Sequence, residues 1–271
     1  MKNIVVEYRL KKSLGQNFLI DENIARKVIK ELHLKQDDIV LEIGPGKGAL
    51  TKYLKDKVKF LIAVEIDKNI ITHLNQELDN DNIEIVHGDI LKIPLVSYAK
   101  KYHAKLRVVG NIPYHLTSPI IFKVLDEHKC VSDLTIMVQR EVALRITAKP
   151  NSKDYGILSV LTQYIGSPRY LFTVSENCFY PPPKVKSAVI QIPIIERDET
   201  DIDEAVFRII VKTSFGKRRK TLRNSLKFLP YPRTVVDNIL SNKSLPLDKR
   251  PENLTVKEFT LLTRQIQNIV R

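Results

Sequence analysis

Tryptophan is absent from this sequence of 271 residues, and cysteine, methionine and histidine are scarce. The two cysteines, Cys130 and Cys178, form no CxxC pair, and no two of the six histidines stand in an HxxxH pattern. Cysteine and histidine clusters with regular spacing are what zinc sites and disulfide scaffolds require. We therefore predict two reduced thiols in or near the core, no metal site and a cytoplasmic protein.

Long hydrophobic runs are also missing. No apolar stretch approaches the roughly 18 residues that a membrane-spanning helix needs. The first twelve residues, MKNIVVEYRLKK, have an apolar part that is too short and too soon interrupted by charge for a signal peptide. The sequence shows no internal repeat and no low-complexity tract. These absences predict an ordinary globular protein that does not span a membrane.

Acidic residues are outnumbered: 44 Lys and Arg face 31 Asp and Glu, which gives a net charge of +13. An excess of this size on a short chain favours a polyanionic partner. An acidic membrane surface would be the other candidate, but we find no amphipathic segment with a basic face and bulky apolar residues. The charge therefore favours nucleic acid without specifying which.

Apolar runs alternate with helical patterns over the first two thirds of the chain. This alternation is typical of βαβ units and a parallel sheet. Two further runs are joined without a helix, which predicts an antiparallel pair at one end of that sheet. The seven predicted strands are 39–43, 60–66, 83–87, 106–109, 134–138, 170–174 and 188–192. Helices are expected at 21–33, 48–57 and 68–79.

The pattern changes at residues 196–204, ERDETDIDE, which hold six acids. Beyond them the chain is predicted to be all-helical, with prolines between the segments. The expected helices are 202–215, 217–228, 233–241 and 255–270. We predict two domains, 1–195 and 196–271. Residues 205–236 carry nine Lys or Arg and no acid, so we expect RNA contacts there, unless this is only a solvated helix face. The candidates are Lys217, Arg218, Arg219, Lys220 and Arg223.

A glycine-rich turn, LEIGPGKG at 41–48, follows the first predicted strand of the sheet. Glycine permits positive φ angles and close approach of the backbone to a ligand. By itself the motif could be a tight strand-to-helix turn. A phosphate-binding loop would require GxxxxGK[ST], and the dinucleotide motif GxGxxG would place its third glycine one residue later.

Acidic residues stand at the ends of the next two strands. Glu65 comes 21 residues after Gly44, where a carboxylate can accept the hydroxyls of a ribose, and Asp89 can meet an adenine edge. Each alone could be a cap or a surface acid. Together with the glycine turn they predict an adenosine pocket without a pyrophosphate site, which fits S-adenosylmethionine better than NAD.

The motif NIPY, residues 111–114, ends the fourth strand. It could be only a turn at an X-Pro step. However, adenine N6 is a poor nucleophile, and an amide oxygen with a backbone carbonyl near Pro113 could accept its N–H groups and favour a pyramidal nitrogen. Tyr114 would supply a stacking face for a flipped base. The pattern therefore favours methyl transfer to an adenine amine.

These motifs together resemble the KsgA (RsmA) family of ribosomal RNA adenine dimethyltransferases over nearly the whole chain. The similar blocks, in order, are KKSLGQNFL (11–19), LEIGPGKGALT (41–51), VEID (64–67), GDI (88–90), GNIPYHLTSPI (110–120), QREVALRITAKPNSKDYGILSV (139–160), FYPPPKVKSAV (179–189) and GKRRKTLRNSLK (216–227). NIPY alone is shared with erythromycin-resistance methyltransferases, whereas the long central block and RRKTLRNSL are similar to the KsgA family.

The resemblance implies a Rossmann-like class I methyltransferase fold, α/β with a seven-stranded mixed sheet, and a small all-α C-terminal domain. It implies an S-adenosylmethionine-dependent enzyme that dimethylates N6 of two adjacent adenosines in the 3′-terminal hairpin of 16S rRNA, within the small (30S) subunit, as part of ribosome biogenesis. Catalytic roles would fall to Asn111, Tyr114 and Phe179. The expected cofactor contacts are Asn17, Leu19, Gly44, Glu65, Asp89 and Asn111.

Several alternatives stay open at this point. The same chemistry could act on large-subunit rRNA, or the fold could serve a non-enzymatic factor that binds nucleic acid. The intact NIPY motif, Glu65 and Asp89 argue against lost catalysis. For Phe179 the alternative is core packing at a strand end. We expect a monomer with neither a metal nor a membrane partner.

Overall fold

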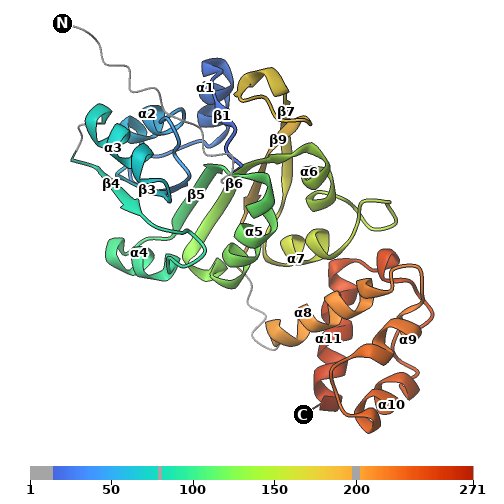
Figure 1. Cartoon of the computed structure of the whole chain (residues 1–271). Coiled ribbons are helices and arrows are strands. Elements are labelled where there is room, and N and C mark those ends of the chain that lie inside the picture. Colours follow the sequence, from blue (N-terminus) through green and yellow to red (C-terminus); the bar gives the residue numbers. More distant parts are fainter. Residues whose placement is uncertain (1–14, 79–80, 197–201, 271) are drawn as a thin grey trace, which may run out of the picture. The chain divides into compact units, whose positions relative to one another are not determined.

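The computed structural model describes residues 15–78, 81–196 and 202–270, which form two compact units (Figure 1). The first unit comprises the described residues up to Ala143 together with Arg169–Ile194. The second comprises Leu144–Pro168 and the described residues from Ile195 onward. No helix in the described part of the chain is both long and apolar enough to span a membrane.

The first unit alternates strands and helices, as the sequence predicts. Its strands are β1 (Phe18–Leu19), β2 (Ile39–Ile43), β3 (Phe60–Glu65), β4 (Ile83–His87), β5 (Leu106–Asn111), β6 (Val131–Gln139), β7 (Arg169–Val174), β8 (Phe179–Tyr180) and β9 (Ser187–Pro193). Its helices are α1 (Glu22–Glu31), α2 (Thr51–Leu54), α3 (Lys68–Glu77), α4 (Leu95–Tyr102) and α5 (Thr117–Asp126), and α6 (Arg140–Ile146) begins in this unit. Short 3₁₀ turns are η2 (Lys55–Lys57), η3 (Tyr114–Leu116), η4 (His128–Cys130) and η5 (Glu176–Cys178).

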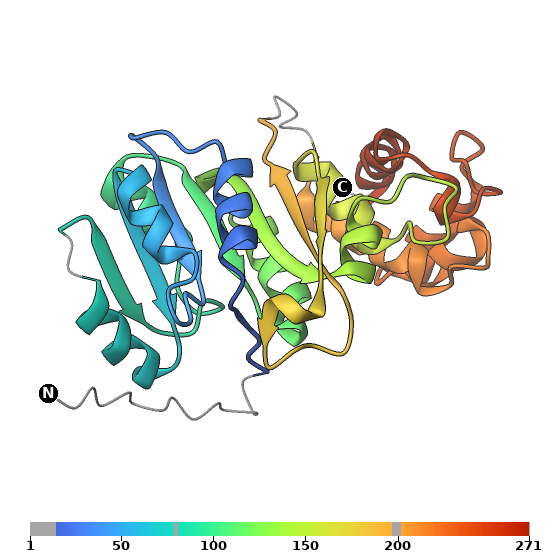
Figure 2. The ribbon, with the colours of Figure 1, turned by 90° about the horizontal axis from the view of Figure 1, so that it is seen from above.

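Seven of these strands form one mixed sheet in the order β4-β3-β2-β5-β6-β9-β7. The first five are parallel to one another, and β9 runs antiparallel to both β6 and β7. Helices cover both faces of the sheet (Figures 1 and 2). The predicted seven-stranded α/β fold and its antiparallel end are therefore confirmed.

Strand β2, the middle one of the five parallel strands, is buried along its whole length. Since parallel strands covered by helices on both faces are shielded on each side, an apolar run such as this one is expected at the centre. The helix after it is shorter than predicted. It begins at Thr51 because the three glycines at 44, 46 and 48 have positive φ angles of 64°, 54° and 78°. The backbone therefore stays in a turn over residues predicted to be helical.

A second sheet of two short strands was not predicted. Phe18 and Leu19 of β1 pair antiparallel with Tyr180 and Phe179 of β8. This pairing brings the N-terminal segment beside a part of the chain roughly 160 residues later in the sequence. Two residues are too few to produce a periodic pattern, so this pairing could not be predicted from the sequence.

The second unit is helical. Its helices are α7 (Ile157–Ile165), α8 (Glu204–Gly216), α9 (Leu222–Ser225), α10 (Arg233–Ser241) and α11 (Val256–Val270), with 3₁₀ turns η6 (Leu226–Phe228) and η7 (Pro251–Asn253). The predicted all-helical C-terminal region is confirmed. The predicted single helix at 217–228 is wrong, because α8 ends at Gly216 and a new helix begins only after Thr221.

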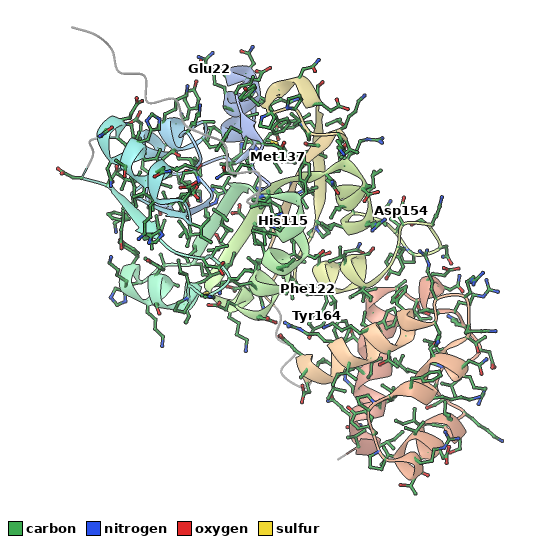
Figure 3. All side chains as sticks on the ribbon, viewed as in Figure 1. Glu22, His115, Phe122, Met137, Asp154 and Tyr164 are labelled. Atoms are coloured by element: carbon green, nitrogen blue, oxygen red, sulfur yellow. The ribbon has the colours of Figure 1, made fainter. Side chains whose placement is uncertain are left out.

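Aromatic side chains hold the second unit together. The Tyr164 ring of α7 stacks on Phe207 of α8, with centroids 4.1 Å apart, and Tyr155 donates a 2.9 Å hydrogen bond to the Leu254 carbonyl (Tyr164 is labelled in Figure 3). Segment 144–168 therefore packs with the C-terminal helices, although the sequence-based division placed it in the first domain. The order of the elements in the sequence does not show that α7, which follows β6, packs with helices that come after residue 202.

Candidate active site

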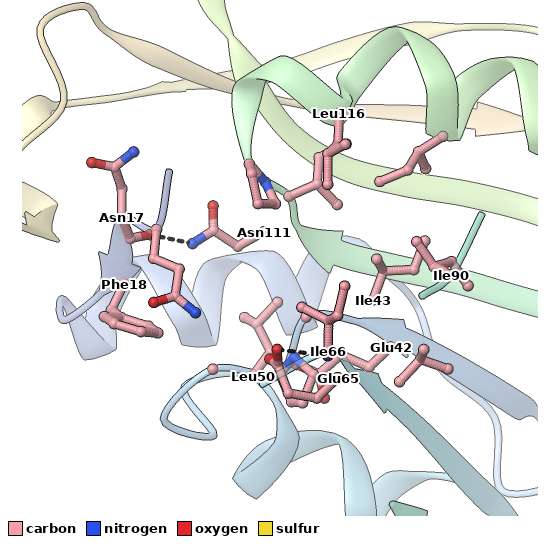
Figure 4. Close-up of a pocket in the computed structure, with 18 of the residues that line it drawn as sticks. Asn17, Phe18, Glu42, Ile43, Leu50, Glu65, Ile66, Ile90, Asn111 and Leu116 are labelled. Atoms are coloured by element: carbon pink, nitrogen blue, oxygen red, sulfur yellow. Dashed lines mark hydrogen bonds between the residues drawn. The ribbon is translucent and has the colours of Figure 1, made fainter. Parts of the chain in front are cut away.

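A cavity of about 250 Å³ lies at the carboxyl ends of the parallel strands (Figure 4). Ligand sites of open α/β sheets are expected at this edge, because the loops after each strand meet there. The loops after β2, β3, β4 and β5 and the segment around β1 line it. The lining residues are 16–19, 42–47, 49–50, 64–66, 88–91, 111–113, 115–116 and 120.

The glycine turn forms one wall of this cavity. Gly44 and Gly46 both line it and both have positive φ angles, a conformation that glycine adopts without steric cost. At Gly46 a Cβ atom would lie 2.8 Å from Cδ1 of Phe18, so a larger residue would displace that ring. The turn thus keeps both its backbone geometry and its close contact with β1.

Glu65 lies at the end of β3 and is 5% exposed. Its Oε1 accepts hydrogen bonds from the backbone N–H groups of Ile66 (2.8 Å) and Asp67 (2.9 Å). Burial raises the pKa of the Glu65 carboxyl, and these backbone N–H groups oppose the rise. The carboxyl is therefore fixed by the backbone in the cavity wall, where it can accept hydroxyl groups.

Asp89 follows β4 and also lines the cavity. Its Oδ1 accepts from the backbone N–H of Leu91 at 3.0 Å. This is the turn-capping contact that short acidic side chains commonly make. Asp89 therefore caps a turn and contributes to the cavity at the same time.

Asn111 ends β5, and its side-chain orientation is fixed. Its Nδ2 donates a 2.9 Å hydrogen bond to the backbone carbonyl of Asn17, as the dashed line in Figure 4 shows. Only the NH₂ end of an amide can donate to a carbonyl, so Oδ1 is left as an acceptor. Gly110 lets β5 approach β2 closely, since a Cβ atom there would lie 2.6 Å from the Ile43 carbonyl oxygen.

The expected cofactor contacts Asn17, Leu19, Gly44, Glu65, Asp89 and Asn111 all line this one cavity. The β1–β8 pairing explains how the first two reach it, because it holds the N-terminal segment against the first unit. The structure therefore brings together all six residues proposed for cofactor binding.

Tyr114 and Phe179 do not line the cavity. The Tyr114 hydroxyl and the Ser187 Oγ are 2.6 Å apart, and burial raises the pKa of this half-buried phenol. Phe179 is 2% exposed and packs in a hydrophobic cluster with Leu19 and Val174. In this structure Phe179 is a core residue, as the alternative interpretation of the sequence held. Stacking of its ring on a base would require this packing to change.

Two residues of the site were missed from the sequence. Glu42, within the LEIGPG motif, lines the cavity at 2% exposure, and its Oε2 is buried without a hydrogen-bond partner. Ser187 is fully buried at the start of β9 and holds the Tyr114 hydroxyl. A charged residue inside an otherwise apolar strand was a usable signal for Glu42. Nothing in the sequence linked Ser187 to Tyr114.

The lining of the cavity fits a cationic ligand that carries no phosphate. Glu42, Glu65 and Asp89 line it, whereas Lys47 is the one Lys or Arg among the described residues that do so. Its ammonium lies 5.9 Å from the centre of the Phe18 ring. The Glu65 and Asp89 carboxyl groups would repel a pyrophosphate, while the unpartnered Glu42 oxygen suits a positive charge. These residues fit S-adenosylmethionine, which has a sulfonium and an ammonium group.

The basic residues predicted to bind RNA differ from one another in the second unit. Lys217, Arg219 and Lys220 are exposed and form none of the ion pairs found among the described residues. Arg218 instead pairs with Glu252, with 2.8 Å between Nε and Oε2. Arg223 donates to the Leu240 carbonyl at 3.0 Å. The last two thus have structural contacts within the unit.

Comparison with known proteins gives consistent matches. Residues 7–266 match the model of the family described as ribosomal RNA adenine dimethylase. Proteins named ribosomal RNA small subunit methyltransferase A are 40% identical in Alkaliphilus metalliredigens (98% of this chain and 95% of that protein) and 44% identical in Flavobacterium johnsoniae (96% and 96%).

Solved structures match the fold. A dimethyladenosine transferase from Plasmodium falciparum has a TM-score of 0.80 at 24% identity, covering 93% of this chain and 98% of that one. The 23S rRNA methyltransferase ErmE has a TM-score of 0.67 at 27% identity, covering 93% and 100%. The proteins matched by sequence are up to 44% identical to this chain, whereas these two solved structures are 24% and 27% identical.

Proposed function

The chain belongs to the ribosomal RNA adenine dimethylase family, and we propose that it transfers methyl groups from S-adenosylmethionine to two adjacent adenosines of 16S rRNA. Family membership makes the chain an rRNA adenine dimethyltransferase. The cofactor's identity, the target hairpin near the 3′ end of the RNA and the residue roles are proposals. The observation that carries them is the fixed Asn111 amide at the edge of an acidic cavity.

Cofactor binding rests on the strand ends. Glu65 would accept the ribose hydroxyls and Asp89 would meet the adenine edge, each held by backbone N–H groups. The turn at Gly44 lets the backbone approach the ligand closely. The cofactor supplies an electrophilic methyl group, so neither a metal nor a covalent nucleophile of the protein is required.

Activation of the target amine rests on Asn111. Since Nδ2 is bound to the Asn17 carbonyl, Oδ1 can accept one N–H of adenine N6. The Pro113 carbonyl already accepts from the Leu116 N–H at 2.9 Å, and its second lone pair can accept the other. Both contacts favour a pyramidal nitrogen whose lone pair points at the methyl group. Asn111 and Pro113 would thus hold the amine for transfer of the methyl group, which the bound cofactor would give up from its sulfonium sulfur to leave an uncharged sulfide, and the proton lost by the nitrogen would pass to solvent.

Tyr114 would stack on the flipped adenine. Its hydrogen bond to Ser187 fixes the ring before substrate arrives, so less conformational freedom is lost on binding. Phe179 would form the opposite face only after it leaves its present packing. We therefore assign the main stacking role to Tyr114.

RNA binding would rest on the exposed cations of the second unit, Lys217, Arg219 and Lys220. Phosphate contacts of this kind supply sequence-independent affinity and fall with added salt. Arg218 and Arg223 would support this surface through their contacts within the unit. We propose that the enzyme works as a cytoplasmic monomer on the preformed 30S subunit during its biogenesis.

Large-subunit RNA is the second candidate substrate, because ErmE, a 23S rRNA methyltransferase, shares the fold and is 27% identical. The relatives named for the small subunit are closer, at up to 44% identity. The test is incubation with methyl-labelled S-adenosylmethionine and either purified 30S subunits or 23S rRNA. We expect label in 16S rRNA alone. Label in 23S rRNA alone would overturn the substrate assignment.

A further inference from the structure

Glu42 is a carboxyl group whose burial the fold does not explain. It lies on strand β2 between Leu41 and Ile43, is 2% exposed, and lines the cavity (Figure 4). Its Oε2 has no hydrogen-bond partner. An unpartnered polar atom in a buried site costs free energy, and a leucine would avoid that cost.

The charges around Glu42 offer it no compensation inside the protein. Glu65 on β3 lies close enough to repel it, and Asp89 after β4 lines the same cavity. Lys47 in the glycine turn is placed over the Phe18 ring, and His115 of η3 lies in the cavity wall. None of the ion pairs found among the described residues includes Glu42.

Burial raises the pKa of Glu42 to about 8, with Glu65 adding to the rise and the adjacent Thr51 hydroxyl opposing it. Near neutral pH the Glu42 carboxyl is therefore mostly protonated before a ligand binds. A positive charge entering the cavity would favour its ionised form. Glu42 is thus placed to respond to the charge of a ligand.

We propose that Glu42 is the counter-ion of the cationic cofactor, releasing its proton to solvent when S-adenosylmethionine binds and taking one up when the uncharged sulfide product replaces it. The inference rests on the proposed function for the identity of the cofactor. S-adenosylhomocysteine lacks the sulfonium charge, so it gains less from an ionised Glu42. The pocket would thereby prefer the methyl donor over the spent product.

Proton release and affinity are linked by thermodynamics. A ligand that binds better when Glu42 is ionised must also promote its ionisation. For the wild type we expect about 0.5–0.9 proton released per S-adenosylmethionine near pH 7, and affinity about threefold to eightfold higher at pH 7 than at pH 6. The expected release follows because Glu42 is mostly protonated before the ligand binds.

The first test is titration calorimetry at pH 7 in two buffers of different ionisation enthalpy, with S-adenosylmethionine and S-adenosylhomocysteine. Glu42→Gln keeps the shape of the side chain and cannot ionise. We expect the variant to lose most of the proton release. Its affinity for S-adenosylmethionine relative to S-adenosylhomocysteine should fall about tenfold compared with the wild type. Because the same ligands are used on both proteins, their own titrating groups cancel in the comparison.

The wild type alone supplies a second measurement, which does not depend on the variant's folding. With isotope-labelled glutamate, infrared difference spectra should lose a protonated carboxyl band on binding S-adenosylmethionine and not on binding the sulfide. If the methyl donor binds without proton release, or if the variant releases as much, the role of Glu42 is refuted and the proposed function stands. If the wild type binds neither ligand, the cofactor assignment itself fails.

Discussion

The two units of the molecule differ in how most of the side chains proposed for function are held. In the first unit Glu65, Asp89 and Asn111 line the cavity with their side chains anchored to the backbone, whereas the Glu42 Oε2 has no partner. In the second unit Lys217, Arg219 and Lys220 have no ion-pair partner among the described residues, and the Lys217 ammonium lies 5.4 Å from the centre of the Phe228 ring. Anchored groups give directional recognition, whereas free cations give affinity that salt weakens. Under the proposed function, the first unit would carry out chemistry at a single nitrogen and the second would contact the polyanion.

The largest effect should come from Asn111. We expect Asn111→Ala to lower the methyl-transfer rate by roughly 10²–10³, because Oδ1 stabilises the reacting amine in the transition state. Cofactor affinity should fall moderately, since the link to Asn17 is lost too. Single-turnover rates at saturating cofactor test this, and RNA affinity should not change. A rate near that of the wild type would contradict a catalytic role for Asn111.

Reversing charge in the second unit should affect RNA binding alone. Arg219→Glu with Lys220→Glu should weaken binding at low salt and reduce the slope of log affinity against log salt by about 2. Arg218 is avoided because its pair with Glu252 supports the fold. The control pair Lys57→Glu and Lys59→Glu makes the same charge change in the first unit. Equal slopes in both double variants would place the RNA contacts elsewhere.

Glu65 allows a sharper test of cofactor recognition. The Oε1 of Glu65 accepts hydrogen bonds from two backbone N–H groups. Glu65→Gln can keep these contacts through its amide oxygen while removing the charge. We expect S-adenosylmethionine binding to weaken by about 2–3 kcal/mol, the value of charge-assisted hydrogen bonds to a ribose. Calorimetry measures it, with the salt dependence of RNA binding as the control that should stay constant. Unchanged cofactor affinity in a folded variant contradicts the assignment.

Tyr114 should show the smallest effects. Tyr114→Ala should lose about 1–3 kcal/mol of base stacking. Tyr114→Phe removes only the hydroxyl that contacts Ser187 and should therefore retain most of the activity. Substrate KM and single-turnover rate of the two variants give the comparison. If both variants lose the same amount of activity, the contribution of Tyr114 comes from its hydroxyl group and not from stacking of its ring.

The sequence predicted the large sheet well because its strands are apolar runs ended by turn residues. The bounds of β2 and β4 match the predicted 39–43 and 83–87. It could not predict the β1–β8 pairing, which joins two-residue strands far apart in the chain. The predicted helix at 217–228 failed because composition does not reveal where a helix is interrupted.

The same distinction applies to the site. Residues at strand ends could be assigned from spacing, because parallel strands bring their carboxyl ends to one edge. Whether a side chain faces the cavity or the core depends on packing. Phe179 is therefore found in the core, and Glu42 entered the site only through the structure.

The most direct test of the proposed function is nucleoside mass spectrometry of purified 30S subunits incubated to completion with the enzyme and labelled S-adenosylmethionine. We predict N6,N6-dimethyladenosine at two adjacent positions of the 3′-terminal hairpin, with partly methylated products at short times. Only N6-monomethyladenosine at completion, or modification at any other site, would contradict the proposal.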